Sequence, residues 1–434
     1  MKKFIQYINS NVLFKVANLN SITIGVKILA GLITSKAIAV LIGAEGMALI
    51  GNLRNFLSAV QSFAIAGLYN GVVKFIGKFK DNAEALSKTL STVFYLGFFT
   101  TMLISFLCYY NAHYINAFLF SENYNYEYVI RILAIVLPFY ALNMFVFAIM
   151  NGFSKYKILL VINIIGQILG LLVTLLLIWQ DNIDGALVAV VITPALNLLI
   201  SLVGILNRKN LMSLVRITNV SLGMLNRLSP YAIMALVSAI AIPIVLIFIR
   251  NYIIAEIGIK EAGYWEAMNR ISYYYLMFVN SLMTLYILPR FSEIDNRKEF
   301  RSEVFNFYKK IMPVFGAVLL LIYFLRPHIV RLVFNEDFSP VEGLFGWQLI
   351  GDFIRVLSMV IAYQFLAKKM FGHFIIIEIF LFVIIYFSSV YLIDIFGIEG
   401  AVMAHCLSYF MHFGIILLIF GSSLFGVISN EDNS

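Results

Sequence analysis

The sequence has little charge for its length. Asp, Glu, Lys and Arg together make up 12% of the 434 residues, whereas 62% are hydrophobic and the mean hydropathy is +0.92. An ordinary soluble domain is about a quarter charged and about half apolar. The shortage of charge therefore excludes a soluble globular domain and indicates a chain that is embedded in a membrane.

Motifs for catalysis, nucleotide binding and metal binding are also missing. Cys108 and Cys406 both lie inside apolar stretches, so we expect buried thiols and neither a disulfide nor a metal site. The chain contains no nucleotide-binding loop, no zinc-type His/Glu motif and no nucleophile elbow. Its first residues, MKKFIQYINSNVLFKVANLN, lack the apolar core and cleavage site of a signal peptide. We expect no catalytic residue, metal or cofactor, and we do not expect an enzyme.

Long apolar runs are what the sequence has in abundance. A membrane-spanning helix needs about 20 mostly apolar residues. Twelve runs meet this requirement, with short polar connections between them. They are 18–42, 47–70, 88–110, 128–151, 156–179, 184–206, 229–252, 262–288, 308–325, 344–367, 371–393 and 399–421. We therefore predict an all-α integral membrane protein with 12 transmembrane helices.

Basic residues gather on one side of this predicted topology. The segments on the side of the N-terminus hold most of the Lys and Arg residues, with Lys74, Lys78 and Lys80 close together in one of them. The opposite loops are acidic, and Glu122 and Asp181 are examples. Positive loops mark the cytoplasmic face of a membrane protein. We predict that both termini are cytoplasmic and, because this pattern explains the net charge of +8, we expect no nucleic-acid partner.

Two short motifs recur in the second half of the chain at nearly the same separation. NIDGALVA at 182–189 resembles GIEGAVMA at 397–404, and AEGMALIGN at 44–52 aligns with EAGYWEAMN at 261–269. Repeats with an even number of spans share one orientation in the membrane and enclose a site near its midplane. We predict two pseudo-symmetric six-helix bundles around a central cavity. The N-terminal lobe is 1–210, the cytoplasmic linker 211–228 and the C-terminal lobe 229–434.

Several basic residues interrupt the predicted spans. They are Lys27, Lys36, Arg54, Arg250, Arg270 and Arg355. A charge at membrane depth costs from about 3 to more than 10 kcal/mol, so such residues usually face a cavity or a partner. A basic cavity selects an anion, and the planar guanidinium matches phosphate oxygens. We predict that Lys27, Arg54 and Arg270 bind a pyrophosphate group, with Arg250 and Arg355 in auxiliary or structural roles. Lys36 is out of phase with Lys27 and is expected near the membrane interface.

Polar residues follow these cations at helical spacing. They predict a polar cavity lining that comprises Ser58, Gln61, Asn269, Tyr273 and Asn280. Ion pairing is the alternative for two cations, because Glu266 is four residues before Arg270 and Asp352 is three before Arg355. For Arg250, near a helix end, the alternative is contact with lipid headgroups. Asp352 and Glu378 are candidates for ion coupling or for such pairing. His405, Ser408 and His412 form a stripe for which helix-to-helix bonding is favoured over a proton relay.

Two longer stretches carry a resemblance to a known family. YNGVVKFIGKFKDNAEAL at 69–86 and LFGWQLIGDFIRVLSMVIAYQFLAKKMFGHFIIIEI at 344–379 resemble the Wzx-type O-antigen and lipid III flippases. These form the polysaccharide transporter branch of the multidrug/oligosaccharidyl-lipid/polysaccharide exporter superfamily. The resemblance implies two six-helix lobes, a cationic cavity and alternating access. Lys27, Arg54, Arg250, Asp352, Lys368 and Glu378 fall in matching stretches, and Arg355 stands where a basic residue is usual. Arg270 does not match clearly, so its assignment depends on spacing alone.

The resemblance also implies a substrate and a place in the cell. The expected cargo is an undecaprenyl-pyrophosphate-linked oligosaccharide used in polysaccharide and lipopolysaccharide synthesis, moved from the cytoplasmic to the periplasmic leaflet. The expected location is the bacterial inner membrane. Membrane lipid and the polysaccharide polymerase machinery are the expected partners, and we expect a monomer.

Three other functions remain open from sequence. A drug exporter of the same superfamily would carry cations and should have an acidic cavity, whereas bases outnumber acids in these spans. A membrane ligase or polymerase acting on lipid-linked sugars should have a large outer loop, and the loops here are short. A scaffold for other synthesis proteins would not explain basic residues on equivalent helices of both halves.

Overall fold

The computed structural model describes residues 12–121, 123–205 and 214–425. Every secondary-structure element within these ranges is a helix, in agreement with the predicted all-α fold. The predicted cytoplasmic N-terminus and C-terminus lie outside the described residues. So do Arg208, Lys209 and residues 211–213 of the predicted linker.

The helices coincide with the predicted spans over most of their lengths. In the described parts of the chain, ten helical stretches are long and apolar enough to cross a membrane. One of them, within α8 (Tyr156–Ile205), covers two predicted spans because its backbone leaves the helical conformation at Asp181 and Asn182. The second predicted span corresponds to α3 (Gly43–Ala64), which is 22 residues long but more polar than the ten. The described helices are therefore consistent with the twelve predicted spans.

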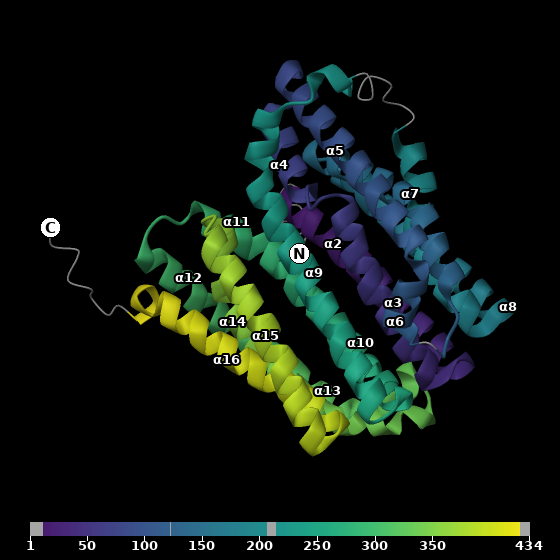
Figure 1. The fold of residues 1–434 in the computed structure, drawn as a ribbon. Coiled ribbons are helices and arrows are strands. Elements are labelled where there is room, and N and C mark those ends of the chain that lie inside the picture. The colour runs from purple at the N-terminus through teal and green to yellow at the C-terminus, as the bar shows by residue number, and fades with distance from the viewer. Residues whose placement is uncertain (1–11, 122, 206–213, 426–434) are drawn as a thin grey trace, which may run out of the picture. The chain divides into compact units, whose positions relative to one another are not determined.

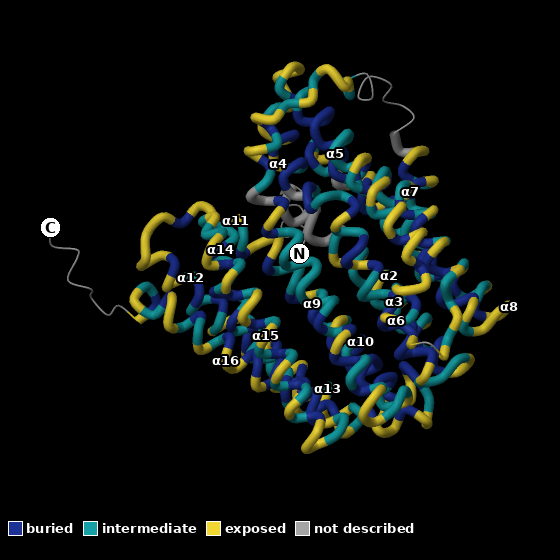
Figure 2. The backbone as a smooth tube through the Cα atoms, in the orientation of Figure 1, coloured by how far each residue is buried: buried dark blue, intermediate teal, exposed yellow. Residues whose placement is uncertain are grey.

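Large apolar side chains cover the outer faces of the helices. Phe99 is 67% exposed, Phe324 is 72% exposed and Leu418 is 84% exposed. Exposed positions run along the helices beside buried ones, as the yellow and blue segments of Figure 2 show. A water-soluble protein does not expose long apolar faces of this kind, whereas lipid solvates them. The chain is a multi-pass membrane protein.

The chain divides into two compact units, one up to Ile247 and one from Phe248 onward. The division falls inside α9 (Leu222–Glu256), a few residues after Pro243. Proline removes one backbone hydrogen bond and weakens a helix locally, so the division lies close to a weakened turn of α9. The predicted lobe boundaries at 210 and 229 remain predictions.

The first unit is built around α5, α7 and α8 (Figure 1). Its elements are α2 (Val12–Leu41), α3, α4 (Tyr69–Phe79), α5 (Ala83–Tyr110), α6 (Ala112–Phe120), α7 (Glu127–Gly152), α8, the short 3₁₀ turn η2 (Ile217–Asn219) and the first part of α9. α2 packs on α8, and α3 and α4 pack on α5 and α7. Asn82 begins α5 by accepting a hydrogen bond from the backbone nitrogen of Ala85 at 3.0 Å.

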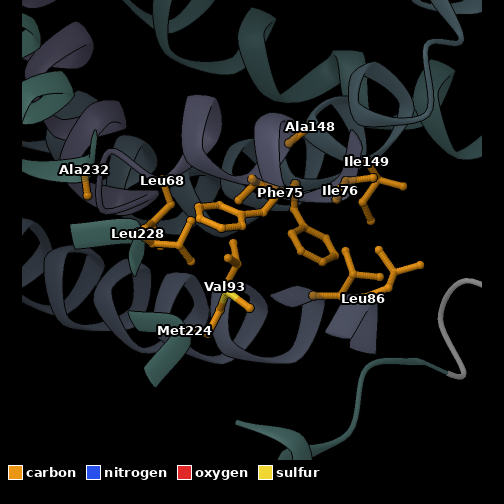
Figure 3. Close-up of a cluster of buried hydrophobic side chains, with 13 residues drawn as sticks. Leu68, Phe75, Ile76, Leu86, Val93, Ala148, Ile149, Met224, Leu228 and Ala232 are labelled. Carbon is orange, nitrogen blue, oxygen red and sulfur yellow. The ribbon is translucent and has the colours of Figure 1, made fainter. Parts of the chain in front are cut away.

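One apolar core of the first unit joins helices that are distant in sequence. Leu68, Phe75 and Leu86 of the α4–α5 region contact Met224 and Leu228 of α9 (Figure 3). Leu228 is fully buried. The start of α9, which the sequence assigns partly to the linker and partly to the C-terminal lobe, thus packs against the first unit.

The second unit is centred on α14 and α16, which pack closely together beside α15 (Figure 1). Its elements are the end of α9, α10 (Ile259–Leu282), the π-helical turn η3 (Met283–Ile287), α11 (Leu288–Glu293), α12 (Arg297–Lys310), α13 (Met312–Val333), the 3₁₀ segment η4 (Glu336–Leu344), α14 (Phe345–Ala367), α15 (Phe371–Phe396) and α16 (Ile398–Phe425). α10 packs against η4, α14 and α16, which brings its polar residues to the centre of the unit.

The recurring motifs form the same hairpin in both units. Asn182 and Gly397 occupy equivalent motif positions and have φ values of 46° and 61°. Three residues later, a Cβ on Gly185 would lie 1.9 Å from the carbonyl oxygen of Leu177. The equivalent distance at Gly400 is 2.0 Å, to the carbonyl oxygen of Leu392. The two motifs therefore make one local structure twice, which supports the predicted internal repeat.

Candidate functional site

The polar stripe of α3 lies on the accessible side of that helix. Arg54 and Gln61 are partly exposed and Ser58 is exposed. Ala59 and Val60 on the other side are buried in the first unit. Because the polar positions recur every three or four residues, the helix presents them together. The structure thus brings three predicted site residues onto one face that a ligand can reach.

Lys27 occupies a similar position on α2. Its side chain is exposed, whereas Ala30, Ser35 and Ile38 on the same helix are buried. Lys36 is partly buried. A side chain of this length keeps its ammonium group in water while its stem covers apolar surface. Lys27 therefore lies at the surface of the first unit.

A buried ion triad joins α9 to α10 in the second unit. Arg250 has no exposed surface, and its Nη2 lies 2.5 Å from Oε2 of Glu266. Nε of Arg270 lies 3.1 Å from Oε1 of the same carboxylate. The Arg250 guanidinium also stacks 5.3 Å from the Trp265 ring centre. The alternative in which Arg250 reaches headgroups is wrong, because Glu266 from the next helix holds it inside the unit.

Glu266 and Arg270 form the i, i+4 ion pair that their spacing in the sequence suggests. Removing one partner of a buried ion pair costs about 3–5 kcal/mol, because the other charge is then left without compensation. Arg250 and Arg270 share one carboxylate and are 0% and 5% exposed. This arrangement favours a structural role for both arginines.

A second polar cluster surrounds Asp352 of α14, whose side chain has no exposed surface. The hydroxyls of Ser272 and Tyr275 on α10 each donate to its Oδ2 at 2.5 Å. Gln348 donates to the same oxygen from one turn earlier at 3.2 Å. Nε2 of His405 on α16 lies 3.0 Å from Oδ1. The carboxylate thus links three helices.

Arg355 makes no direct ion pair with Asp352, contrary to the pairing that their spacing favours. Both oxygens of Asp352 are engaged by α10, α16 and Gln348 instead. The Arg355 guanidinium lies 5.2 Å from the ring centre of Tyr409 and is partly accessible. Among the residues that the structure describes, no carboxylate forms an ion pair with Arg355. Asp352 and Glu378 of α15 interact with its charge at longer range.

The remaining predicted lining residues lie along α10. Tyr273 is 51% exposed, and its ring contacts that of Tyr274 at 6.3 Å. Asn269 and Asn280 are partly buried. The side-chain nitrogen of Asn269 is buried and has no hydrogen-bond partner among the described residues. These residues follow the helix axis and are not gathered at one point.

Sequence reasoning gave little weight to the residues that hold Asp352. Gln348, Asp352 and Arg355 recur at i, i+4 and i+7 on α14, and His405 and Tyr409 are spaced by four on α16. This spacing is the only sequence pattern that we find to indicate the cluster. It shows that residues share a helix face, but it does not show that the two faces meet.

Outside these clusters, the described residues include a basic pocket on α12, which is lined by Lys298, Arg301, Ser302, Phe305, Asn306 and Lys309. In the described ranges, no group of three or more His, Cys, Asp or Glu residues could hold a metal ion. A cavity of about 270 Å³ lies between α4, α5 and α7, with Leu68, Val72, Phe94 and Phe145 among its walls. These walls are apolar and suit hydrocarbon rather than a charged group.

Comparison with known sequences gives consistent matches. The sequence profile of the family described as "Polysaccharide biosynthesis protein" matches residues 15–295, well over half of the chain. The protein named lipid III flippase from Escherichia coli (strain K12) is 28% identical over 397 residues, which cover 91% of this chain and 95% of that protein. The lipid III flippase of Shigella flexneri matches with the same values.

Comparison with solved structures establishes the fold. An inward-facing multidrug resistance MATE family transporter of the MOP superfamily superposes with a TM-score of 0.77 at 13% identity, covering 93% of this chain and 96% of that chain. An outward-facing MATE transporter of the same superfamily gives 0.70 at 14% identity, covering 97% of each chain. At these identities the likeness establishes the arrangement of the helices but does not identify the cargo. Evidence on the cargo comes from the residues of the site.

Proposed function

Since the chain belongs to the polysaccharide biosynthesis protein family, we propose that it is a flippase for lipid-linked oligosaccharide. Its cargo is an undecaprenyl-pyrophosphate-linked repeat unit of the O-antigen or lipid III type. It moves this lipid from the cytoplasmic to the periplasmic leaflet of the bacterial inner membrane by alternating access, with both termini in the cytoplasm. Two relatives named lipid III flippase, aligned over 91% of the chain, support this proposal.

The observation that supports the proposal is which charged residues inside the predicted spans are accessible and which are buried. Lys27 and Arg54 lie on accessible helix faces, and Arg355 is partly accessible without an ion pair among the described residues. Asp352 is fully buried and already accepts several hydrogen bonds. Glu378 is a partly accessible acid in these spans, so the accessible charge is positive on balance. It suits a pyrophosphate better than the cationic cargo of a drug exporter.

The structure changes the roles that we assign to individual arginines. We propose that Lys27, Arg54 and Arg355 contact the pyrophosphate during the transport cycle. Arg250 and Arg270 hold α9 against α10 through Glu266 and act only indirectly. We therefore propose a direct binding role for Arg355, for which the sequence predicts an auxiliary role. For Arg270 we propose a structural role in place of the binding role.

Transport by purified protein in liposomes tests this assignment. Arg54→Ala removes a charge-assisted contact of about 1.5–3 kcal/mol and should slow oligosaccharide movement about ten- to hundredfold. Arg54→Lys keeps the charge without the planar fork and should fall between that variant and wild type. Arg131→Ala is the matched control, because Arg131 is an exposed arginine of the same unit that already pairs with Glu127. Normal transport by Arg54→Ala would remove Arg54 from the mechanism.

The same assay separates the flippase from an enzyme. A flippase delivers an unchanged lipid-linked oligosaccharide to the other leaflet. Release or polymerisation of the sugar by the purified protein would favour the ligase or polymerase alternative. We also propose that the protein associates with the polysaccharide polymerase machinery, which cross-linking in native membranes tests. We further propose that it is a monomer, which size analysis in detergent tests.

A further inference from the structure

The basic pocket on α12 takes no part in the proposed pyrophosphate contacts. It has a volume of about 580 Å³, and its cations are Lys298, Arg301 and Lys309. All three side chains are exposed. The Arg301 guanidinium lies 5.9 Å from the ring centre of Phe305, another residue of the pocket wall. The pocket therefore combines three positive groups with an aromatic ring on one face of one helix.

The carboxylates of α12 do not neutralise these cations. Glu299 forms the N-terminal cap with Asn296, whose side-chain nitrogen donates to Oε1 of Glu299 at 2.7 Å. Oε2 of Glu303 lies 3.6 Å from Nε of Arg290. In the part of the chain that the structure describes, no side chain forms an ion pair or a hydrogen bond with the three pocket cations. Their charge is therefore available to an anion from outside the protein.

The opposite face of α12 is apolar and anchors the helix to the second unit. Phe300, Val304 and Phe307 are buried, and α12 packs against α16 (Figure 1). The Phe300 ring centre lies 5.8 Å from that of Phe420 on α16. At 3.6 residues per turn, these buried positions lie across the helix axis from the pocket. α12 is thus held in place by its apolar face and directs its basic face outward.

The accessible face of α12 continues into α13 and changes from basic to apolar there. The backbone nitrogen of Ile311 donates to the oxygen of Phe307 at 2.8 Å, so the helical path continues through the junction. Pro313 is exposed one turn after Lys309, and Leu320 is 61% exposed three turns after it. A bilayer changes from headgroups to hydrocarbon in the same way. The pocket therefore lies beside a surface that lipid chains cover.

We propose that the α12 pocket binds the phosphate headgroup of an anionic phospholipid whose acyl chains lie along α13. This lipid is a neighbour in the bilayer and not the cargo, so the inference goes beyond the proposed function. Clusters of Lys and Arg directly beside a membrane span attract anionic lipid. Arg301 offers a planar fork to phosphodiester oxygens, and Lys298 and Lys309 add point charges on either side of it. The apolar continuation on α13 favours a lipid over an acidic soluble protein, which would leave that surface uncovered.

The simpler alternative is that these charges only set the orientation of α13 in the membrane. Orientation depends on the number of basic residues near a span and not on the helix face that carries them. Arg297 and Lys310 are exposed cations of the same helix that do not line the pocket. The pocket variant, Arg301→Gln/Lys309→Gln, and the control variant, Arg297→Gln/Lys310→Gln, each remove one arginine and one lysine from α12. They differ in whether the pocket loses its charge, so the second is the matched control for the first.

The test measures the lipid that the purified full-length protein retains in detergent. The protein is equilibrated with phosphatidylglycerol and phosphatidylcholine of identical acyl chains, and the bound lipids are counted by native mass spectrometry. Wild type should retain phosphatidylglycerol in preference, and each cation near a headgroup changes the affinity about fivefold. The pocket variant should therefore bind phosphatidylglycerol about 25-fold more weakly, with phosphatidylcholine unchanged. The control variant should stay within about threefold of wild type.

Two additional measurements locate the lipid and check the fold. Phosphatidylglycerol with a photoactivatable headgroup should label residues 298–309 of wild type and of the control variant, and not of the pocket variant. Without added lipid, the three proteins should melt at the same temperature in detergent, because all four substituted side chains are exposed. Added phosphatidylglycerol should raise the melting temperature of wild type and of the control variant more than that of the pocket variant.

Several results would overturn the inference. Equal losses of phosphatidylglycerol in the two variants would show a general effect of charge without a site. Equal retention of both phospholipids by wild type would leave the pocket without a lipid. Displacement of phosphatidylglycerol by inorganic phosphate at the same concentration would indicate a site for a soluble anion. Stronger binding of a synthetic polyprenyl pyrophosphate than of phosphatidylglycerol would assign the pocket to the cargo instead. None of these results depends on transport, so the proposed function is tested separately by Arg54→Ala.

Discussion

At the scale of single residues, the basic side chains differ in burial and in their surroundings. Arg250 and Arg270 share Glu266 and are buried. Arg355 rests on an aromatic ring, and Arg54 lies on an accessible helix face. Sequence alone shows six similar positive charges inside apolar spans. Only the approach of α9 to α10 shows that two of them are neutralised within the protein.

Glu266→Gln tests the structural role of the triad. Glutamine keeps the shape of the side chain but removes the charge between Arg250 and Arg270, so both guanidiniums lose their buried counter-charge. We expect the free energy of unfolding in detergent to fall by about 3–5 kcal/mol. Glu256→Gln at the exposed end of α9 is the control and should have little effect. Unchanged stability of Glu266→Gln would place the arginines in a binding role after all.

At the scale of elements, the two hairpins show how one short motif specifies one shape in two places. Asn182 and Gly397 both adopt a left-handed φ, which asparagine and glycine tolerate better than other residues. The glycine three positions later lets the next helix approach a backbone carbonyl of the preceding one. The sequence reveals the recurrence, and the structure supplies its reason.

Gly185→Ala should therefore destabilise the first unit. Its new methyl group would lie 1.9 Å from the carbonyl oxygen of Leu177, which is backbone and cannot rotate away. We expect a loss of about 1–3 kcal/mol, seen as a lower melting temperature in detergent. Gly400→Ala should do the same in the second unit. Gly97→Ala on α5 is the control, because nothing lies within 4 Å of that site and alanine favours a helix. Equal effects at the three positions would contradict the hairpin argument.

At the scale of the whole molecule, the spans and the family were predictable from sequence, whereas the inner side-chain partners were not. Apolar runs identify membrane helices because lipid requires every backbone group to bond within its own helix. The predicted break between 156–179 and 184–206 appears as the kink at Asp181 and Asn182. The Asp352–His405 pair depends on α14 packing against α16, a tertiary contact that periodicity does not encode.

The measurement that tests the central claim most directly compares two cargoes in one liposome assay. One is an oligosaccharide on an undecaprenyl pyrophosphate anchor, and the other is the same oligosaccharide on an uncharged lipid anchor of equal length. If accessible cations such as Arg54 and Arg355 select the cargo, wild type moves the pyrophosphate form and leaves the uncharged form behind. Equal movement of both forms would contradict the account.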